Sequence, residues 1–76
     1  MGHRESIAAR LRELRRLKSA KEDRDISQRE VAEAVGVSEA SISNWETARS
    51  GIGYEDAWKL ADYYEVSIND LAGRTV

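Results

Sequence analysis

The sequence predicts an all-α fold of five helices, and three observations support this prediction. In several segments, apolar residues recur at spacings of three and four, which places them on one face of a helix. Serines that can cap a helix precede three of these segments, and a glycine follows one of them. The chain has 76 residues, 41% of them hydrophobic, which is enough to bury a modest core. We therefore expect one compact domain over residues 1–76.

The first helix is expected at about residues 6–20. Its apolar stripe comprises Ile7, Leu11, Leu14 and Leu17. The following segment, residues 19–25, is densely charged and has no apolar period. It is either a helical extension or an exposed loop, and we expect it to be the most mobile interior part of the chain.

The second helix is expected at about residues 28–35. Ser27 and Glu30 have the spacing of a capping box at its start. Gly36 follows the last apolar residue, where a left-handed residue commonly ends a helix.

The third helix is expected at about residues 39–48, with Ser38 as its cap and Ile42 and Trp45 on its inward face. Only three residues separate it from the second helix. Such a short connection suits a crossing at roughly 90–120°, as in a helix-turn-helix.

The last two helices are expected at about residues 54–64 and 68–72. Ser67 and Asp70 have the spacing of a second capping pair, before the buried Ile68 and Leu71. The buried face of the fourth helix should comprise Ala57, Trp58, Leu60, Ala61 and Tyr64.

The composition argues against catalysis and metal binding. The chain has no cysteine, and His3 alone cannot form a metal site or a catalytic dyad. No apolar run approaches the roughly 18 residues that a membrane span needs. We expect a cytoplasmic protein that is not an enzyme and uses no cofactor.

Positive charge is concentrated in the N-terminal part of the chain. Residues 1–29 carry nine Lys and Arg against five Asp and Glu, whereas residues 30–76 carry three against nine. The formal net charge of −2 therefore does not exclude a nucleic-acid partner, because binding depends on where positive charge is displayed. On charge alone, the first helix is more simply explained as having an ordinary solvated face made of Arg10, Arg12, Arg15, Arg16 and Lys18.

The stretches "SQREVAEAVGVSEASISNWE" and "LADYYEVSINDLAG" resemble the helix-turn-helix domain of the phage repressor and Cro superfamily, also called xenobiotic-response-element-like regulators. The similarity runs without a gap from about Ile26 to Leu71, and the first helix fits once an insertion is allowed before Ile26. The resemblance implies a compact lambda-repressor-like domain that binds double-stranded DNA with its third helix in the major groove.

This resemblance also implies roles for individual residues. Gln28 matches a glutamine that contacts phosphate at the start of the second helix, and the other expected phosphate contacts are Ser38, Ser41, Arg49 and Ser50. The side chains expected to face the bases are Glu39, Ala40, Ser43, Asn44 and Thr47. Arg15 and Glu46 match an ion pair that joins the first helix to the end of the recognition helix.

The short side chains of the third helix suit a groove about 12 Å wide. Asn44 can bond bidentately to adenine, Glu39 can accept from a cytosine amino group, and Ala40 can contact a thymine methyl group. Glu39 is equally explained as an acid favoured by the helix dipole. Because this helix has no Arg, Lys or Gln, we expect each copy of the chain to bind DNA weakly.

Three features depart from the family's pattern. Ala48 and Glu65 stand where glycine is frequent, so both turns are expected to be longer or mildly strained. The segment before Ile26 is about six residues longer than usual, which leaves its role open.

The sequence therefore suggests a sequence-specific regulator of transcription, most simply a phage or prokaryotic repressor. Weak binding by each copy favours a homodimer on a palindromic site. Its surface would be the last helix, with Leu71 and Val76, or the aromatic side chains Tyr54, Tyr63 and Tyr64. The alternative is a protein-interaction module, antitoxin-like or regulator-sequestering, that uses the acidic residues 30–76.

Overall fold

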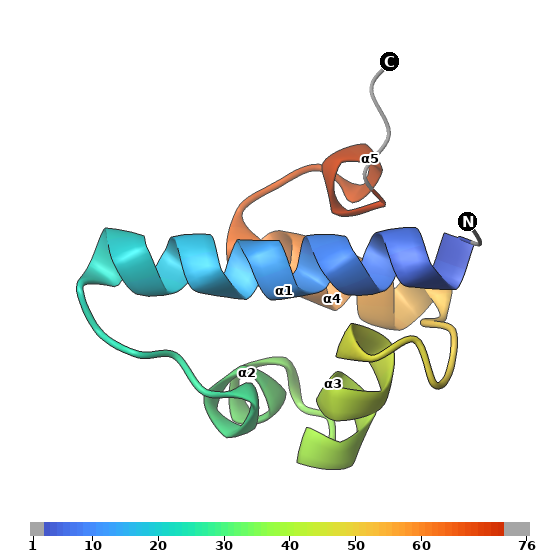
Figure 1. The fold of residues 1–76 in the computed structure, drawn as a ribbon, viewed down its shortest axis with the longest axis horizontal. Helices are drawn as coiled ribbons and strands as arrows, with labels where there is room; N and C mark the ends of the chain where they lie inside the picture. Colours follow the sequence, from blue (N-terminus) through green and yellow to red (C-terminus); the bar gives the residue numbers. More distant parts are fainter. Residues whose placement is uncertain (1–2, 73–76) are drawn as a thin grey trace.

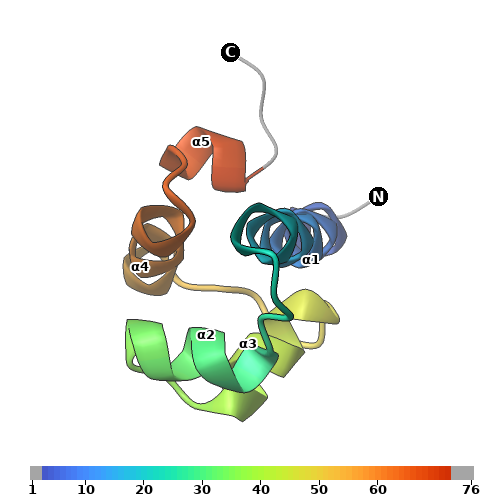
Figure 2. The same ribbon diagram turned by 90° about the vertical axis from the view of Figure 1, so that its left-hand side faces the viewer.

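Five α-helices make up the structure, a computed structural model that describes residues 3–72. They are α1 (His3–Glu22), α2 (Gln28–Val35), α3 (Glu39–Glu46), α4 (Tyr54–Tyr64) and α5 (Ile68–Leu71). The helices α2 and α3 lie on one side of α1, and α5 lies on the other (Figure 1). A view turned by 90° shows α1 and α4 next to each other between these two ends (Figure 2). The all-α fold class is confirmed.

Three helices differ in length from the sequence-based expectation. Helix α1 continues past residue 20, because Lys18 pairs with Glu22 one turn later at 2.7 Å, and it stops before Asp23, which has a φ of 53°. Helix α3 ends at Glu46 rather than at Ala48, because Ala48 has a φ of 62° and cannot continue a right-handed helix. Helix α5 ends one residue early, at Leu71.

The core lies between α1, α4 and the buried faces of the three shorter helices. Its fully buried members include Ile26, Val31, Ile42, Leu60 and Leu71. Burial of Leu71, which is only 1% exposed, contradicts its expected place on a dimer surface. Val76, proposed beside it, lies outside the described residues.

Two side chains expected in the core are exposed instead. Trp58 is 52% exposed, because the inward face of α4 is formed by Ala57, Leu60 and Ala61, and Trp58 projects beside that face. Leu17 is 46% exposed and lines an open groove between α1 and the turn that follows α4. Periodicity identified the apolar side of each helix, but the neighbouring elements do not cover all of it.

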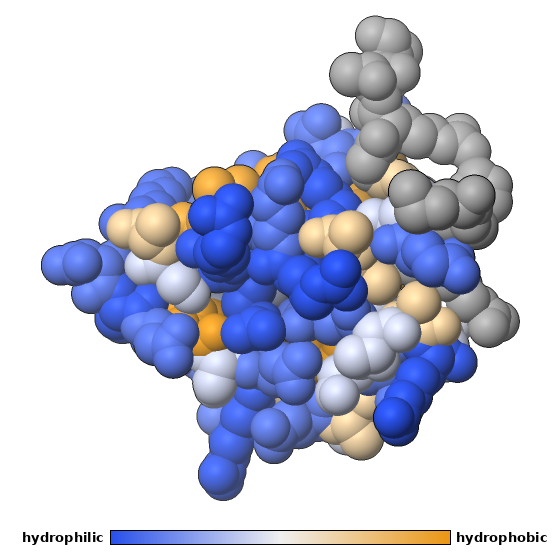
Figure 3. All heavy atoms as spheres, in the orientation of Figure 1, coloured by the Kyte–Doolittle hydropathy of each residue, from blue (hydrophilic) through white to orange (hydrophobic). Residues whose placement is uncertain are grey.

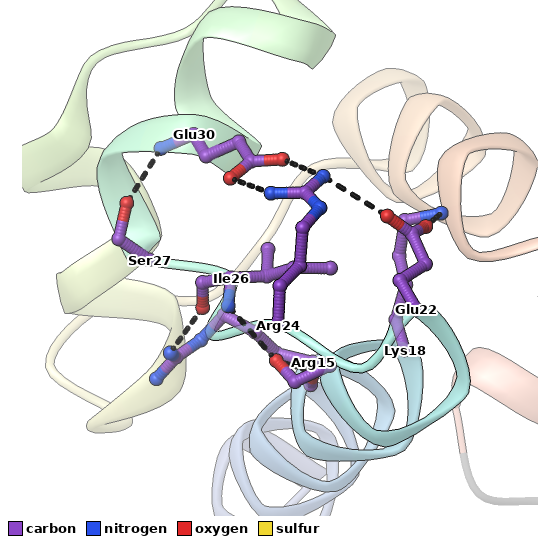
Figure 4. A network of polar contacts seen from close by, with 8 residues as sticks. Arg15, Lys18, Glu22, Arg24, Ile26, Ser27 and Glu30 are labelled. Carbon is purple, nitrogen blue, oxygen red and sulfur yellow. Dashed lines mark hydrogen bonds and ion pairs between the residues drawn. The ribbon is translucent and has the colours of Figure 1, made fainter.

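The charged segment 19–25 is a helical extension followed by a short turn that is anchored at both ends. Ser19 Oγ accepts a hydrogen bond from the Ile26 N–H at 3.0 Å and donates to the Arg15 carbonyl at 2.9 Å. Arg15 Nη1 in turn donates to the Ile26 carbonyl at 3.0 Å (Figure 4). These bonds fix the chain just before α2 begins.

Only one half of the expected capping box at the start of α2 is present. Ser27 Oγ accepts from the Glu30 N–H at 3.1 Å, as expected. The carboxylate of Glu30 instead accepts from Arg24, with an Nη1–Oε1 distance of 2.8 Å (Figure 4). A guanidinium is a stronger partner for a carboxylate than a backbone N–H, so Arg24 takes the place of the reciprocal bond.

The helices pack into a compact body. The radius of gyration is 11.3 Å, close to the roughly 11.4 Å expected for a compact domain of this length. On the face seen in Figure 3, hydrophilic residues predominate and apolar areas are small and separate. None of the helices within residues 3–72 is long and apolar enough to cross a membrane.

Candidate nucleic-acid interface

The turn between α2 and α3 is fixed by backbone hydrogen bonds and a cap. Gly36 adopts the left-handed conformation with a φ of 79°, and the N–H groups of Gly36 and Val37 donate to the Ala32 carbonyl at 2.9 and 3.0 Å. This confirms that Gly36 ends the helix. Ser38 Oγ then accepts from the Ser41 N–H at 3.1 Å and starts α3. The helix-turn-helix is therefore held by local interactions as well as by the core.

One face of α3 is buried, and the residues of the other face are exposed or half-buried. Ile42, Trp45 and Glu46 are buried against the rest of the protein. Of the side chains expected to face the bases, Glu39 and Ala40 on α3 and Thr47 directly after it are exposed, and Ser43 and Asn44 on α3 are half-buried.

These side chains differ in whether the protein's own hydrogen bonds already engage them. Thr47 Oγ1 donates to the Ser43 carbonyl at 2.7 Å, so its hydroxyl is already committed to the end of the helix. Within residues 3–72, no hydrogen bond or ion pair engages the side chains of Asn44 and Glu39. The amide of Asn44 thus remains available both to donate and to accept.

The Glu46 side chain joins three helices. It is 1% exposed, and Arg15 on α1 binds it bidentately, with Nε–Oε2 and Nη2–Oε1 distances of 2.9 Å. Gln28 on α2 adds a third bond, from Nε2 to Oε1 at 3.0 Å. The hydrogen bonds with Glu46 raise the pKa of Arg15, against the opposing effect of burial. Burial, and then the negative charge of Glu46, raise the pKa of the neighbouring Tyr64.

The expected phosphate contacts lie near both ends of α3. Gln28 is half-buried and uses one N–H on Glu46, which leaves a second N–H on the same nitrogen. The hydroxyls of Ser38 and Ser41 lie 2.9 Å apart and bind each other. Arg49 is exposed in the loop after α3, where its backbone N–H donates to the Asn44 carbonyl at 2.9 Å.

Ser50 belongs to the same loop. It is half-buried, and its N–H also points to the Asn44 carbonyl, at 3.4 Å. The loop is therefore folded back on the last turn of α3, with Ala48 in the left-handed region at its start.

One interaction at this site was not expected from the sequence. Arg12 on α1 donates from Nη1 to the backbone carbonyl of Glu46. The available signal was its spacing, because Arg12 lies three residues before Arg15 and so shares its face of the helix.

Comparison with protein families identifies the domain. The helix-turn-helix family model HTH_3 matches residues 17–71, which is most of the chain. No match was found among curated proteins or solved structures. The matched residues contain the complete α2–turn–α3 unit and the loop that follows it. The chain therefore belongs to the Cro/cI-type helix-turn-helix family and is a domain that binds double-stranded DNA.

Proposed function

We propose that this chain is a sequence-specific repressor of transcription, of phage or prokaryotic origin, that inserts α3 into the major groove of an operator. The observation that carries this proposal is the division of α3 into two faces. Its inward face is locked by Ile42, Trp45 and the Glu46 ion pair, while its outer face is open and has short side chains. A rigid helix of this kind can enter a groove without separating the two DNA backbones.

Base reading is assigned chiefly to Asn44, with Glu39, Ala40, Ser43 and Thr47 around it. Asn44 has a free amide that suits bidentate binding to adenine, whereas Thr47 can offer mainly its methyl group. Phosphate binding is assigned to Gln28, at the start of α2, and to Arg49, which is exposed in the loop after α3. Ser38, Ser41 and Ser50 would add weaker contacts.

A homodimer would compensate for the absence of Lys and Arg from α3. Tyr54 and Trp58 form the exposed aromatic pair of α4, with 71% and 52% exposure and ring centroids 6.4 Å apart. Exposed aromatic side chains are enriched in protein interfaces. This pair is therefore our proposed dimer contact, in preference to Tyr63 and Tyr64, which are half-buried.

Selection of bound duplexes from a random pool tests the proposed function. Enrichment of a two-fold symmetric sequence with half-sites one helical turn apart, about 34–36 Å, is the expected result. A protein-interaction module would enrich nothing and would show no affinity for duplex even at low salt. That outcome would reject the repressor assignment.

A further inference from the structure

The net charge of the recognition helix α3 is negative, which is unfavourable for a helix that enters a groove of DNA. Residues 39–46 carry two glutamates and neither Lys nor Arg. A helix of this charge is repelled by the phosphates on either side of a groove unless neighbouring elements supply cations. In the described part of the chain, two guanidinium groups contact α3, those of Arg12 and Arg15.

These two arginines are used in different ways. Arg15 neutralises the buried carboxylate of Glu46, and its side chain is only 26% exposed. Arg12 donates one N–H to the Glu46 carbonyl, which lies at the negative end of the α3 dipole, and its side chain is exposed. A guanidinium has five N–H donors, so Arg12 retains donors that face solvent beside the recognition helix.

Arg12 and Gln28, an assigned phosphate contact, both bind Glu46. Gln28 reaches Glu46 from α2 through its Nε2 atom, and Arg12 reaches the same residue from α1. Arg12 binds the backbone carbonyl of Glu46 and Gln28 binds its carboxylate, so both side chains reach the C-terminal end of α3.

We propose that Arg12 is a further phosphate-binding residue, which extends the DNA interface from the helix-turn-helix onto α1. One of its N–H groups holds the end of α3, and the others bind a phosphate next to the one that Gln28 contacts. This inference rests on the proposed function, since it concerns the same DNA-bound state.

Arg10 provides a matched control on the same helix. Its Nε donates to the Asp70 carbonyl on α5 at 2.9 Å, and its Nη1 pairs with Glu13. Helix α5 lies on the side of α1 opposite to α2 and α3 (Figure 1). Arg10 thus has the same charge as Arg12 but faces away from the proposed DNA surface.

The experiment measures the salt dependence of binding to a fluorescent duplex of mixed sequence, using the full chain. The variants are Arg12→Gln, Arg12→Lys and Arg10→Gln, each first checked by thermal unfolding. Glutamine keeps an amide donor but has no charge, whereas lysine keeps the charge. A plot of log K against log salt has a negative slope, and Arg12→Gln should make it less steep by about 0.9. The association constant should then fall about 3.5-fold less between 50 and 200 mM salt than it does for the wild type. Arg12→Lys and Arg10→Gln should keep the wild-type slope.

Three results would overturn the proposal. If Arg12→Gln keeps the wild-type slope, Arg12 only supports α3. If Arg10→Gln lowers the slope as much as Arg12→Gln does, the effect is one of overall charge. If the wild-type chain itself shows no salt-dependent binding, the proposed function and this inference both fail. In the first two cases the wild-type chain still binds DNA, so only the inference about Arg12 fails.

Discussion

The guanidinium of Arg15 and the carboxylate of Glu46 form a bidentate ion pair that fixes the recognition helix to the longest helix of the protein, with both N–O distances at 2.9 Å. Glu46 closes the buried face of α3, and Arg15 also binds the Ile26 carbonyl just before α2. One carboxylate therefore links α3 to both α1 and α2. Among the described residues, no buried side-chain N or O atom lacks a hydrogen-bond partner, so removal of this carboxylate breaks a complete network.

Replacing Glu46 with alanine should lower the free energy of unfolding by about 3 kcal/mol, because the guanidinium of Arg15 and the amide of Gln28 lose their shared partner. Urea unfolding gives this value. Glu33→Ala is the control. Glu33 forms an exposed ion pair with Arg29, with an Nε–Oε2 distance of 3.8 Å, and this pair should contribute less than about 0.5 kcal/mol to stability. Equal effects of the two substitutions would show that the ion pair does not hold α3.

Arg24 connects α1 to α2 by binding Glu22 and Glu30, and low pH should weaken this connection. The hydrogen bonds from Arg24 lower the pKa of Glu30 below its ordinary value of 4.5. Hydrogen bonds from Lys18, and to a smaller extent from Arg24, lower the pKa of Glu22. A carboxyl whose pKa is lower in the folded state stabilises that state above its unfolded pKa and loses this effect as the pH falls through the folded value. Stability from these groups is thus lost below about pH 4.5.

Arg24→Ala should therefore reduce the dependence of stability on acid. We expect the difference in melting temperature between about pH 6 and pH 3 to be smaller for this variant than for the wild type, while Arg24→Lys retains most of the difference. Melting followed by circular dichroism measures it. An unchanged pH dependence in Arg24→Ala would mean that the Arg24 bonds do not contribute in solution.

The turn after the recognition helix should tolerate glycine better than its native residue. Ala48 has a φ of 62°, a conformation that is unfavourable for a residue with a Cβ. Ala48→Gly is expected to raise the free energy of unfolding by about 0.5–1 kcal/mol and to leave DNA affinity unchanged.

Gly36→Ala is the complementary substitution and should be destabilising by about 1–2 kcal/mol. No atom lies within 4 Å of the Cβ that it would add, so the cost comes from the φ of 79° rather than from a clash. A destabilised Ala48→Gly variant would contradict this account of the two turns.

Trp58→Ala should separate dimerisation from folding. Because Trp58 is half exposed, its removal should change stability by less than about 1 kcal/mol. Affinity for a duplex with one half-site should be retained, and the additional affinity for two half-sites should be lost. Titration of both duplexes measures this difference. If Trp58→Ala keeps the additional affinity for two half-sites, the dimer contact lies elsewhere.

The features that were predictable from the sequence are those with a local physical cause. Ser27 and Ser38 have the spacing of caps, Gly36 suits a left-handed end, and Ile42 and Trp45 repeat at a helical interval. Each of these signals depends only on residues within a few positions of one another. The arrangement of α2, the turn and α3 is therefore predictable from the sequence.

The features that were not predictable depend on distant neighbours. Periodicity places Leu17 and Trp58 near apolar faces, but only the packing of other helices decides whether they are covered. Arg24 displaces Glu30 from its reciprocal cap through a bond across six positions, and Arg12 contacts α3 across 34 positions. The Arg15–Glu46 pair spans a similar separation, and it was expected only through the family resemblance.

In the proposed complex, Asn44 reads bases while Gln28 binds the DNA backbone. The most direct measurement compares the affinities of Asn44→Ala and Gln28→Ala for the selected operator and for a mixed-sequence duplex. Asn44→Ala should lose about 1–3 kcal/mol of discrimination between them, and Gln28→Ala should weaken both complexes equally and keep the ratio. If Asn44→Ala keeps the full wild-type discrimination, α3 does not read the operator as described.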